Sequence, residues 1–335
     1  MVSRLPVLLL GVALAALPAA CAPSFPGDPA PGASEGAALP RDVELRQLLA
    51  QQARLWDIGY LLLSRSTDLC AGRQRTSFGF QAWTRWDIGG SYRIASMAAY
   101  GLDDQLRVVH ILPGSPAAEA GLHAGDVIEK IYWHEIPSGR KASAAMQQIL
   151  EREAQVGAPL AFYLRRGGDR LVIDIVPRRR CDFDLILTGS NQINAFFDGQ
   201  RVYVTDGLAR FFGDDAELAA VIGHVLGHAL LGHAGDWSLP EEVMERLGAL
   251  QMATMEPEDR DRLLAAGITP EARPFSQAQE IEADDLARQL LSRAGIRPEA
   301  LADAWRRLAN VTEGAVLLRD FHPATPERLN VIGGS

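Results

Sequence analysis

Two histidines at helical spacing are the residues of this chain whose types and positions most clearly indicate chemistry. His224 and His228 stand four positions apart in the apolar stretch ELAAVIGHVLGH. Side chains at i and i+4 lie on one face of a helix, so the two imidazoles can bind one metal ion. Two histidines on an apolar helix are more often satisfied core residues than ligands, so the prediction of a metal site requires a third ligand.

A second pair of residues at the same spacing supplies that ligand. Glu280 and Asp284 lie in QAQEIEADDLARQLLSRAG, a predicted helix that Ser276 and Gln279 can open as a capping box. Two histidines and one glutamate leave the fourth position of a tetrahedral zinc ion open for water, which is the catalytic arrangement. Asp284 is predicted to hydrogen-bond a ligating imidazole. An isolated acidic run would favour a solvated helix face, but the histidine pair favours the metal site.

The residue after the first histidine decides whether such a site can cleave peptides. In the H-E-x-x-H pattern this position is a glutamate, which removes a proton from the metal-bound water. The chain has Val225 there, and valine cannot accept a proton. Loss of a general base typically lowers a rate by about 10² to 10⁴ fold, while the metal and the substrate contacts remain. Codons for glutamate and valine can differ by one nucleotide, so a point variant or a sequence reading error is an alternative explanation for Val225.

Four segments after residue 181 occur in the order of a known family: NAFFDGQRVYVTDGL, ELAAVIGH, EIEAD and FHPATPERLN. On these segments, residues 182–335 resemble the zinc metallopeptidase family that includes HtpX, BepA and the CAAX prenyl endopeptidases. The resemblance implies a mainly helical gluzincin-type domain that binds one zinc ion. It also implies that His224, His228 and Glu280 are the ligands and that Asp284 orients one of them.

The same resemblance assigns roles to residues outside the metal motifs. His322 resembles the downstream histidine of the family's HP-x-x-x-x-R segment, which would stabilise an oxyanion or fill the open metal position. It is also the best candidate for a substitute base in place of Val225, since imidazole titrates near neutrality. Residues 205–208 would align a substrate backbone by edge pairing. His233 is expected to be structural or a helix C-terminal cation, and residues 235–273 to form a lid over the cleft.

Residues 76–178 resemble a PDZ domain of the kind found in bacterial proteases. VVHILPGSPAAEAGLHAGDVIEKI predicts a strand, a turn, a short helix and a further strand. Residues 142–153 are expected to form the helix beside a peptide groove, and LAFYLRRGGDRLVIDIVP a hairpin. A long insert, residues 83–100, leaves open whether the groove is accessible. The resemblance implies that a loop binds the carboxylate of a peptide C-terminus while the peptide adds as a strand. The loop consists of Ser77, Phe78, Gly79 and Phe80.

The N-terminus has the pattern of a secretory signal. Residues 1–21 contain a basic residue, an apolar run too short for a stable membrane span, and small residues before Cys21. The segment resembles a bacterial lipoprotein signal, in which acylation of Cys21 anchors the chain. Ala22 in the next position implies the periplasmic face of the outer membrane. Cleavage after Ala22, which would give a soluble periplasmic protein, is the alternative, and residues 22–41 are expected to be a flexible tether.

The two remaining cysteines, Cys70 and Cys181, are predicted to form a disulfide, because an oxidising compartment favours pairing over two free thiols. The bond would clamp the PDZ-like segment against its neighbour. Between the tether and that segment, residues 42–70 begin with apolar residues at helical spacing. They predict an amphipathic helix that packs on the body of the protein.

Composition limits the classes of function. The chain has 335 residues, 47% of them hydrophobic, which is material for about two domains. Its net charge of -9 argues against nucleic acid as a partner. We therefore predict an α+β multidomain protein, with a PDZ β-sandwich or barrel followed by the metallopeptidase domain. It is expected to bind zinc and unfolded or C-terminal polypeptide segments, with strongly impaired hydrolysis. The alternative is an active zinc metalloendopeptidase of periplasmic quality control that uses a substitute base.

Overall fold

The computed structural model describes residues 40–70, 72–188, 191–197, 201–233, 275–311, 322 and 326–333. They belong to one compact unit, Pro40–Ser335. The predicted signal, Cys21, nearly all of the tether and the whole insert between the metal motifs lie outside the described residues. Among the helices within those ranges, none is long and apolar enough to cross a membrane.

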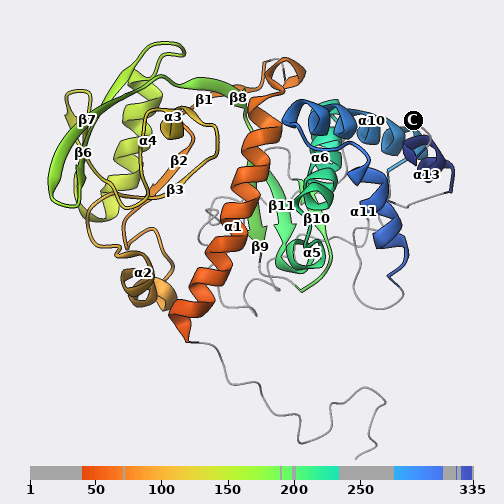
Figure 1. The fold of residues 1–335 in the computed structure, drawn as a ribbon, viewed down its shortest axis with the longest axis horizontal. Helices are drawn as coiled ribbons and strands as arrows, with labels where there is room; N and C mark the ends of the chain where they lie inside the picture. Colours follow the sequence, from red (N-terminus) through yellow and green to blue (C-terminus); the bar gives the residue numbers. More distant parts are fainter. Residues whose placement is uncertain are drawn as a thin grey trace, which may run out of the picture. The chain divides into compact units, whose positions relative to one another are not determined.

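Helices and strands follow the long helix α1 (Arg41–Ser64) in two groups, which together give an α+β chain (Figure 1). The first group comprises η1 (Thr67–Cys70), β1 (Gln74–Ser77), β2 (Phe80–Trp83), η2 (Gly90–Tyr92), α2 (Arg93–Tyr100), β3 (Arg107–Ile111), α3 (Pro116–Glu119), β4 (Val127–Ile131), β5 (His134–Glu135), η3 (Gly139–Lys141), α4 (Ala142–Glu153), β6 (Leu160–Arg166), β7 (Asp169–Ile175) and β8 (Arg178–Cys181). The second comprises β9 (Asp184–Thr188), β10 (Ala195–Phe197), β11 (Arg201–Thr205), α5 (Asp206–Phe211), α6 (Asp215–Leu231), α10 (Gln277–Ala294), α11 (Ala300–Ala309) and α13 (Pro326–Gly333).

The first group builds an antiparallel sheet in the order β2-β3-β4-β6-β7, with β5 paired to β4. Its core includes Val108, Ile131 and Phe162 from the strands and Met146 from α4. The predicted helix at 142–153 is α4, and the predicted hairpin is β6–β7. Strand β2 lies at the end of the sheet and follows the loop that was expected to bind a carboxylate. The assignment of this group as a PDZ domain stays a prediction.

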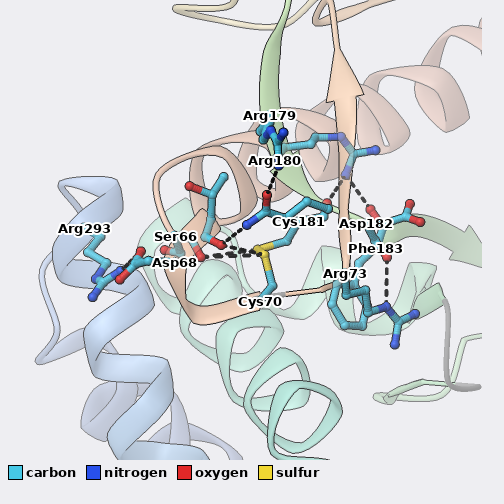
Figure 2. The surroundings of a disulfide bond; sticks show 12 residues. Ser66, Asp68, Cys70, Arg73, Arg179, Arg180, Cys181, Asp182, Phe183 and Arg293 are labelled. Carbon is cyan, nitrogen blue, oxygen red and sulfur yellow. Dashed lines mark hydrogen bonds and ion pairs between the residues drawn. A yellow bond between two sulfur atoms is a disulfide. The ribbon is translucent and has the colours of Figure 1, made fainter. Parts of the chain in front are cut away.

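A disulfide joins the two ends of the first group. Strands β1 and β8 pair in an antiparallel way, with Gln74 opposite Cys181. Cys181 is bonded to Cys70, and their Cα atoms lie 5.7 Å apart (Figure 2). Both cysteines are buried in the hydrophobic core of the second group. An ion pair between Asp68 and Arg293 of α10 lies close by (Figure 2). The bond therefore ties both ends of the first group to the second.

The second group places helices around a short mixed sheet. The sheet has the order β10-β11-β9, in which β9 and β11 are parallel and β10 is antiparallel to β11. Helix α6 is apolar on nearly all sides and buried from Leu218 to His228, because α10, α11 and the sheet all pack against it (Figure 1). A helix with no solvated face gives its polar side chains no contact with bulk water, so histidines within it need protein or metal partners.

Helix α1 packs on the body of the protein with both of its halves, as predicted from its apolar spacing. Leu45 and Leu49 join a cluster with Trp83 and α2, while Leu55 joins the core of the second group. Between them, the buried amide of Gln52 donates to the Leu185 carbonyl and accepts from the Leu187 N–H of β9. Both bonds satisfy backbone groups of β9 at the outer edge of the mixed sheet. Helix α1 therefore covers that edge.

Candidate metal centre

Helix α6 presents its two histidines one turn apart on a buried face. The side chain of Asp214 caps its first turn by accepting a hydrogen bond from the Ala216 N–H. The helix ends at Gly232, which has a φ of 67°, the left-handed conformation that glycine tolerates. His224 and His228 are fully buried, and their ring centroids lie 4.6 Å apart.

Helix α10 supplies the acidic residues from the opposite side. Ser276 and Gln279 form the predicted capping box, in which each side chain bonds the backbone of the other. Because this box fixes the helix start, Glu280 falls in the first turn and Asp284 one turn later. Both carboxylates are buried, with 2% and 0% of their residues exposed. Acidic residues this deeply buried need partners, which excludes the alternative of a solvated helix face for these two positions.

Four donor groups converge on one point, with every pair of ligand atoms within 4.8 Å; they belong to His224, His228, Glu280 and His322. His224 Nε2 lies 3.0 Å from His228 Nε2 and 3.4 Å from Glu280 Oε2. His228 Nε2 lies 3.4 Å from Glu280 Oε1. In tetrahedral zinc with bonds of about 2.0–2.1 Å, neighbouring ligand atoms are roughly 3.3 Å apart. The three predicted ligands therefore have the spacing that one zinc ion requires.

The protonation states of Glu280 and His228 fit a metal ion. For His224, burial and Arg328 lower the pKa, but Asp284 and Glu280 outweigh them and raise it. Burial alone raises the pKa of Glu280, but hydrogen bonds from His224, His228 and His322 hold it well below its usual range. Burial lowers the pKa of His228 to about 3. An ionised carboxylate and a neutral imidazole are the forms that bind zinc. Glu280 Oε2 is buried and forms an ion pair with Arg328, whose Nη1 lies 2.5 Å away.

Asp284, which was predicted to orient a ligating imidazole, lies against the ring of His224. Its Oδ1 lies 2.8 Å from His224 Nδ1 and also accepts hydrogen bonds from Trp305 Nε1, at 3.2 Å, and Arg328 Nη2, at 2.8 Å. Burial raises the pKa of Asp284, but Arg328 and His224 outweigh it and lower the pKa to about 2. The ionised carboxylate keeps a proton on His224 Nδ1, which leaves Nε2 to face the other donors.

Four further residues of the site were not predicted as part of it. Arg328 closes the HP-x-x-x-x-R segment, so its motif could have identified it, whereas no spacing in the sequence indicates Trp305. His233 Nδ1 lies 3.0 Å from Nδ1 of His228. Phe275, the residue before the capping box, stacks on His228 with ring centroids 3.8 Å apart. The contacts of Arg328, Trp305 and Phe275 join segments distant in sequence, whereas His233 follows His228 by only five residues.

Val225 lies in the wall of a small pocket beside the donor groups, and its side chain is buried. The residues that line the pocket are mostly apolar: Asn194, Ala195, Phe196, Phe197, Val225, His228, Phe275 and His322. None of these eight lining residues is a carboxylate. Within the described part of the chain, the only side chains of this pocket that can take up a proton are therefore the two histidines.

The prediction that residues 205–208 align a substrate by edge pairing is wrong. Thr205 ends β11, which is the central strand of its sheet and is paired on both sides. Its hydroxyl then accepts a hydrogen bond from the Leu208 N–H, which starts helix α5. The end strand on the pocket side is β10, and Ala195, Phe196 and Phe197 of that strand line the pocket with Val225.

The predicted carboxylate-binding loop, Ser77–Phe80, lies in a separate cleft. The cleft is lined by this loop, β2, α4, α1 and β9. The Gly79 carbonyl accepts hydrogen bonds from the Leu112 N–H and the Ser115 hydroxyl. Gly79 has a φ of 80°, and an added Cβ would lie 2.1 Å from Ser115 Cβ, so this turn requires glycine. The cleft contains both the end strand β2 and the helix α4, and Trp83, Trp86 and Asp87 of the 83–100 insert also line it.

A buried helix with two histidines, a second helix with a glutamate and an aspartate, and a histidine from the C-terminal segment define a metallopeptidase-type centre. In agreement, the sequence model of peptidase family M48 matches residues 163–334. The chain belongs to this family.

Curated relatives match part of the chain. The beta-barrel assembly-enhancing protease of Yersinia pestis is 28% identical over 182 residues, which cover 50% of this chain and 37% of that protein. Metalloprotease LoiP of Escherichia coli (strain K12) is 34% identical over 146 residues, which cover 42% and 57%. The chain thus spans less than two thirds of the length of both relatives. Among solved structures, the PDZ domain of HtrA3 bound to a phage-derived ligand is 24% identical, covers 32% of this chain and 88% of that chain, and has a TM-score of 0.24.

Proposed function

We propose that this M48-family protein binds one zinc ion and holds polypeptide segments, with peptide hydrolysis strongly impaired. The ligands would be His224, His228 and Glu280, whose spacing suits zinc, and the protonation states of His228 and Glu280 suit it as well. The observation that carries the proposal is Val225, an apolar side chain beside a donor set that is otherwise complete.

Zinc at this centre would polarise a substrate carbonyl and lower the pKa of a bound water. The rest depends on the chain's own residues. Asp284 is ionised and would hold the imidazole of His224 in place. Removal of a proton from water needs an acceptor within hydrogen-bond reach, and Val225 provides none. The geometry therefore supports binding of a metal ion and a substrate, but it offers no base at position 225 for hydrolysis.

His322 is better placed to fill the fourth metal position than to act as a base. Its Nδ1 lies 3.1 Å from His224 Nε2 and 2.8 Å from Glu280 Oε1, close to the 3.0–3.4 Å found among the three predicted ligands. Burial lowers the pKa of His322, so the ring is neutral and can offer a lone pair.

Replacement of His322 distinguishes the two roles. We expect the purified His322→Ala chain to retain one zinc ion and to show no change in its very low rate of casein cleavage, measured with and without a chelator. His134→Ala, which removes a histidine outside the centre, is the control. A chelator-sensitive rate in the unaltered chain that disappears only in His322→Ala would instead identify His322 as a substitute base.

Polypeptide binding is proposed for the cleft beside β2, since an end strand can add a peptide strand and the preceding loop can receive its carboxylate. Gly79→Ala is expected to weaken binding of a fluorescent hexapeptide with a free C-terminal valine by at least about tenfold, or 1.4 kcal/mol. The added methyl group would collide with Ser115 and displace the loop. Fluorescence anisotropy with the free and the amidated peptide measures the effect.

A matched control separates the two effects of Gly79→Ala on peptide binding: the collision with Ser115 and the strain of alanine at a positive φ. Gly101 also has a positive φ, 63°, but no atom lies within 4 Å of an added Cβ. Gly101→Ala should therefore bind the peptide as the unaltered chain does. Equal affinities for the free and the amidated peptide, or equal losses in both variants, would contradict a carboxylate-binding role for the loop.

The site of action is proposed to be the bacterial envelope, with Cys21 acylated and the chain on the periplasmic face of the outer membrane. The support is the secretory pattern of residues 1–21 and the pairing of Cys70 with Cys181, since disulfides persist in oxidising compartments. Metabolic labelling with a fatty acid tests the anchor, and Cys21→Ser should abolish the label.

Metal content tests the zinc centre directly. The chain without its signal should purify with one zinc ion, and His224→Ala and Glu280→Ala should each lose it. Elemental analysis after gel filtration measures the stoichiometry. Retention of stoichiometric zinc by both variants would contradict the assignment of the ligands.

A further inference from the structure

The second predicted ligand, His228, has an imidazole partner outside the metal motifs. His228 Nδ1 lies 3.0 Å from His233 Nδ1. The other ring nitrogen of His233 lies 3.0 Å from Glu282 Oε2. Three side chains from two helix ends thus form a continuous chain of hydrogen bonds that begins at the metal centre.

Only one arrangement of protons allows both of these hydrogen bonds to form when His228 binds a metal. Its Nε2 faces His224 and Glu280, so the lone pair on that atom is used for the metal and the proton is on Nδ1. His228 Nδ1–H must then donate to His233 Nδ1. His233 consequently carries its proton on Nε2 and donates it to the carboxylate of Glu282. Each donor meets an acceptor, so each of the two hydrogen bonds contains one proton.

The backbone after α6 holds His233 in place. Gly232 turns the chain with a φ of 67°, and the His233 N–H then donates to the His228 carbonyl at 3.0 Å. This turn brings the ring of His233 back over the last turn of the helix, where it is 8% exposed. The short link between the two histidines therefore makes the contact a property of the local fold.

The two histidine ligands are held by different kinds of acceptor. His224 donates to Asp284, a carboxylate that is fully buried. His228 is separated from its carboxylate, on the exposed Glu282 side chain, by the ring of His233. A direct carboxylate contact to both imidazoles would put a third negative charge near Glu280 and Asp284, whereas a neutral imidazole accepts the same proton without adding charge.

We propose that His233 is a positioning residue of the zinc centre: it accepts the Nδ1–H of His228, is itself oriented by Glu282, and so holds His228 Nε2 toward the metal. The proposal rests on the proposed zinc centre. It assigns no contact between His233 and the metal or a substrate.

A pair of nearly isosteric substitutions tests it through zinc affinity rather than activity. Asparagine places Oδ1 near the position of histidine Nδ1 and can accept the same hydrogen bond, whereas leucine cannot. Loss of an outer partner of a zinc ligand typically costs about 10–100 fold in metal affinity. His233→Leu in the full chain without its signal should therefore bind zinc about 10–100 fold more weakly, and His233→Asn should stay within about threefold of the unaltered chain. Competition with a chromophoric chelator measures the affinities, and the visible spectrum of the cobalt(II) form reports the ligand geometry.

Glu282, the exposed residue at the end of this series of hydrogen bonds, provides a further test that leaves the fold intact. Glu282→Ala should weaken zinc binding by less than His233→Leu, since it removes only the group that orients His233. Asp285→Ala, which removes another exposed carboxylate of α10, should have no effect. If the unaltered chain binds zinc but both His233 variants bind it equally well, or both lose it equally, the positioning role is overturned. Failure of the unaltered chain to bind zinc would instead overturn the proposed function.

Discussion

A Val225→Glu chain is expected to cleave casein about 10² to 10⁴ fold faster than the unaltered chain, and only when zinc is bound. The new carboxylate would follow His224 on a buried helix and would enter the pocket beside His228 and His322. Burial raises the pKa of a carboxyl group, which brings it closer to the neutral range in which a general base is most effective. Initial rates with and without a chelator measure the effect.

The matched control for this variant is Val225→Gln. Glutamine has the size and polarity of glutamate but cannot remove a proton at neutral pH, so it should bind zinc and remain as slow as the unaltered chain. The account of Val225 as the lost base does not survive if fully zinc-loaded Val225→Glu and Val225→Gln have the same low rate.

Gly227→Ala is expected to lower the free energy of unfolding by roughly 1–3 kcal/mol and to weaken zinc binding. Gly227 lies between His224 and His228 in the sequence of α6 and faces α10. An added Cβ would lie 2.7 Å from the carbonyl oxygen of Ala283. That oxygen belongs to the backbone of α10, so it cannot move aside as a flexible side chain could. The methyl group must push away the helix that carries Glu280 and Asp284.

The same helix offers a control one turn earlier. An added Cβ at Gly223 would lie 3.7 Å from the nearest atoms of Ala287, an ordinary van der Waals contact. Gly223→Ala should therefore leave zinc affinity unchanged and raise the free energy of unfolding by up to about 1 kcal/mol, since alanine favours a helix interior over glycine. Urea unfolding and chelator competition on both variants measure the changes. Shifts of the same sign and size would mean that the distance between α6 and α10 does not control the site.

Periodicity and motif spacing predicted the parts of the fold that depend on short stretches of chain. The i, i+4 pairs placed His224 beside His228, the capping box fixed where α10 begins, and residues 142–153 form the expected helix. In each case the information lies within about four turns of one helix. The disulfide could be anticipated from composition alone, because only two cysteines remain after Cys21.

Contacts between distant segments were harder to predict. Residues 205–208 resemble a strand that meets a substrate, but whether a strand lies at the end or the centre of a sheet depends on its neighbours. Here β9 and β10 flank β11 and exclude that role. Trp305, on α11, and Phe275, which precedes the capping box of α10, contact the site through packing that no local pattern encodes.

The central claim is that the centre binds zinc but lacks an effective base, and one measurement tests both halves together: zinc stoichiometry and chelator-sensitive casein cleavage on the same preparation of the unaltered chain. The account predicts one zinc ion per chain and no cleavage above that of a His224→Ala control. Chelator-sensitive cleavage by the zinc-loaded, unaltered chain would contradict it, because another residue would then be acting as the base.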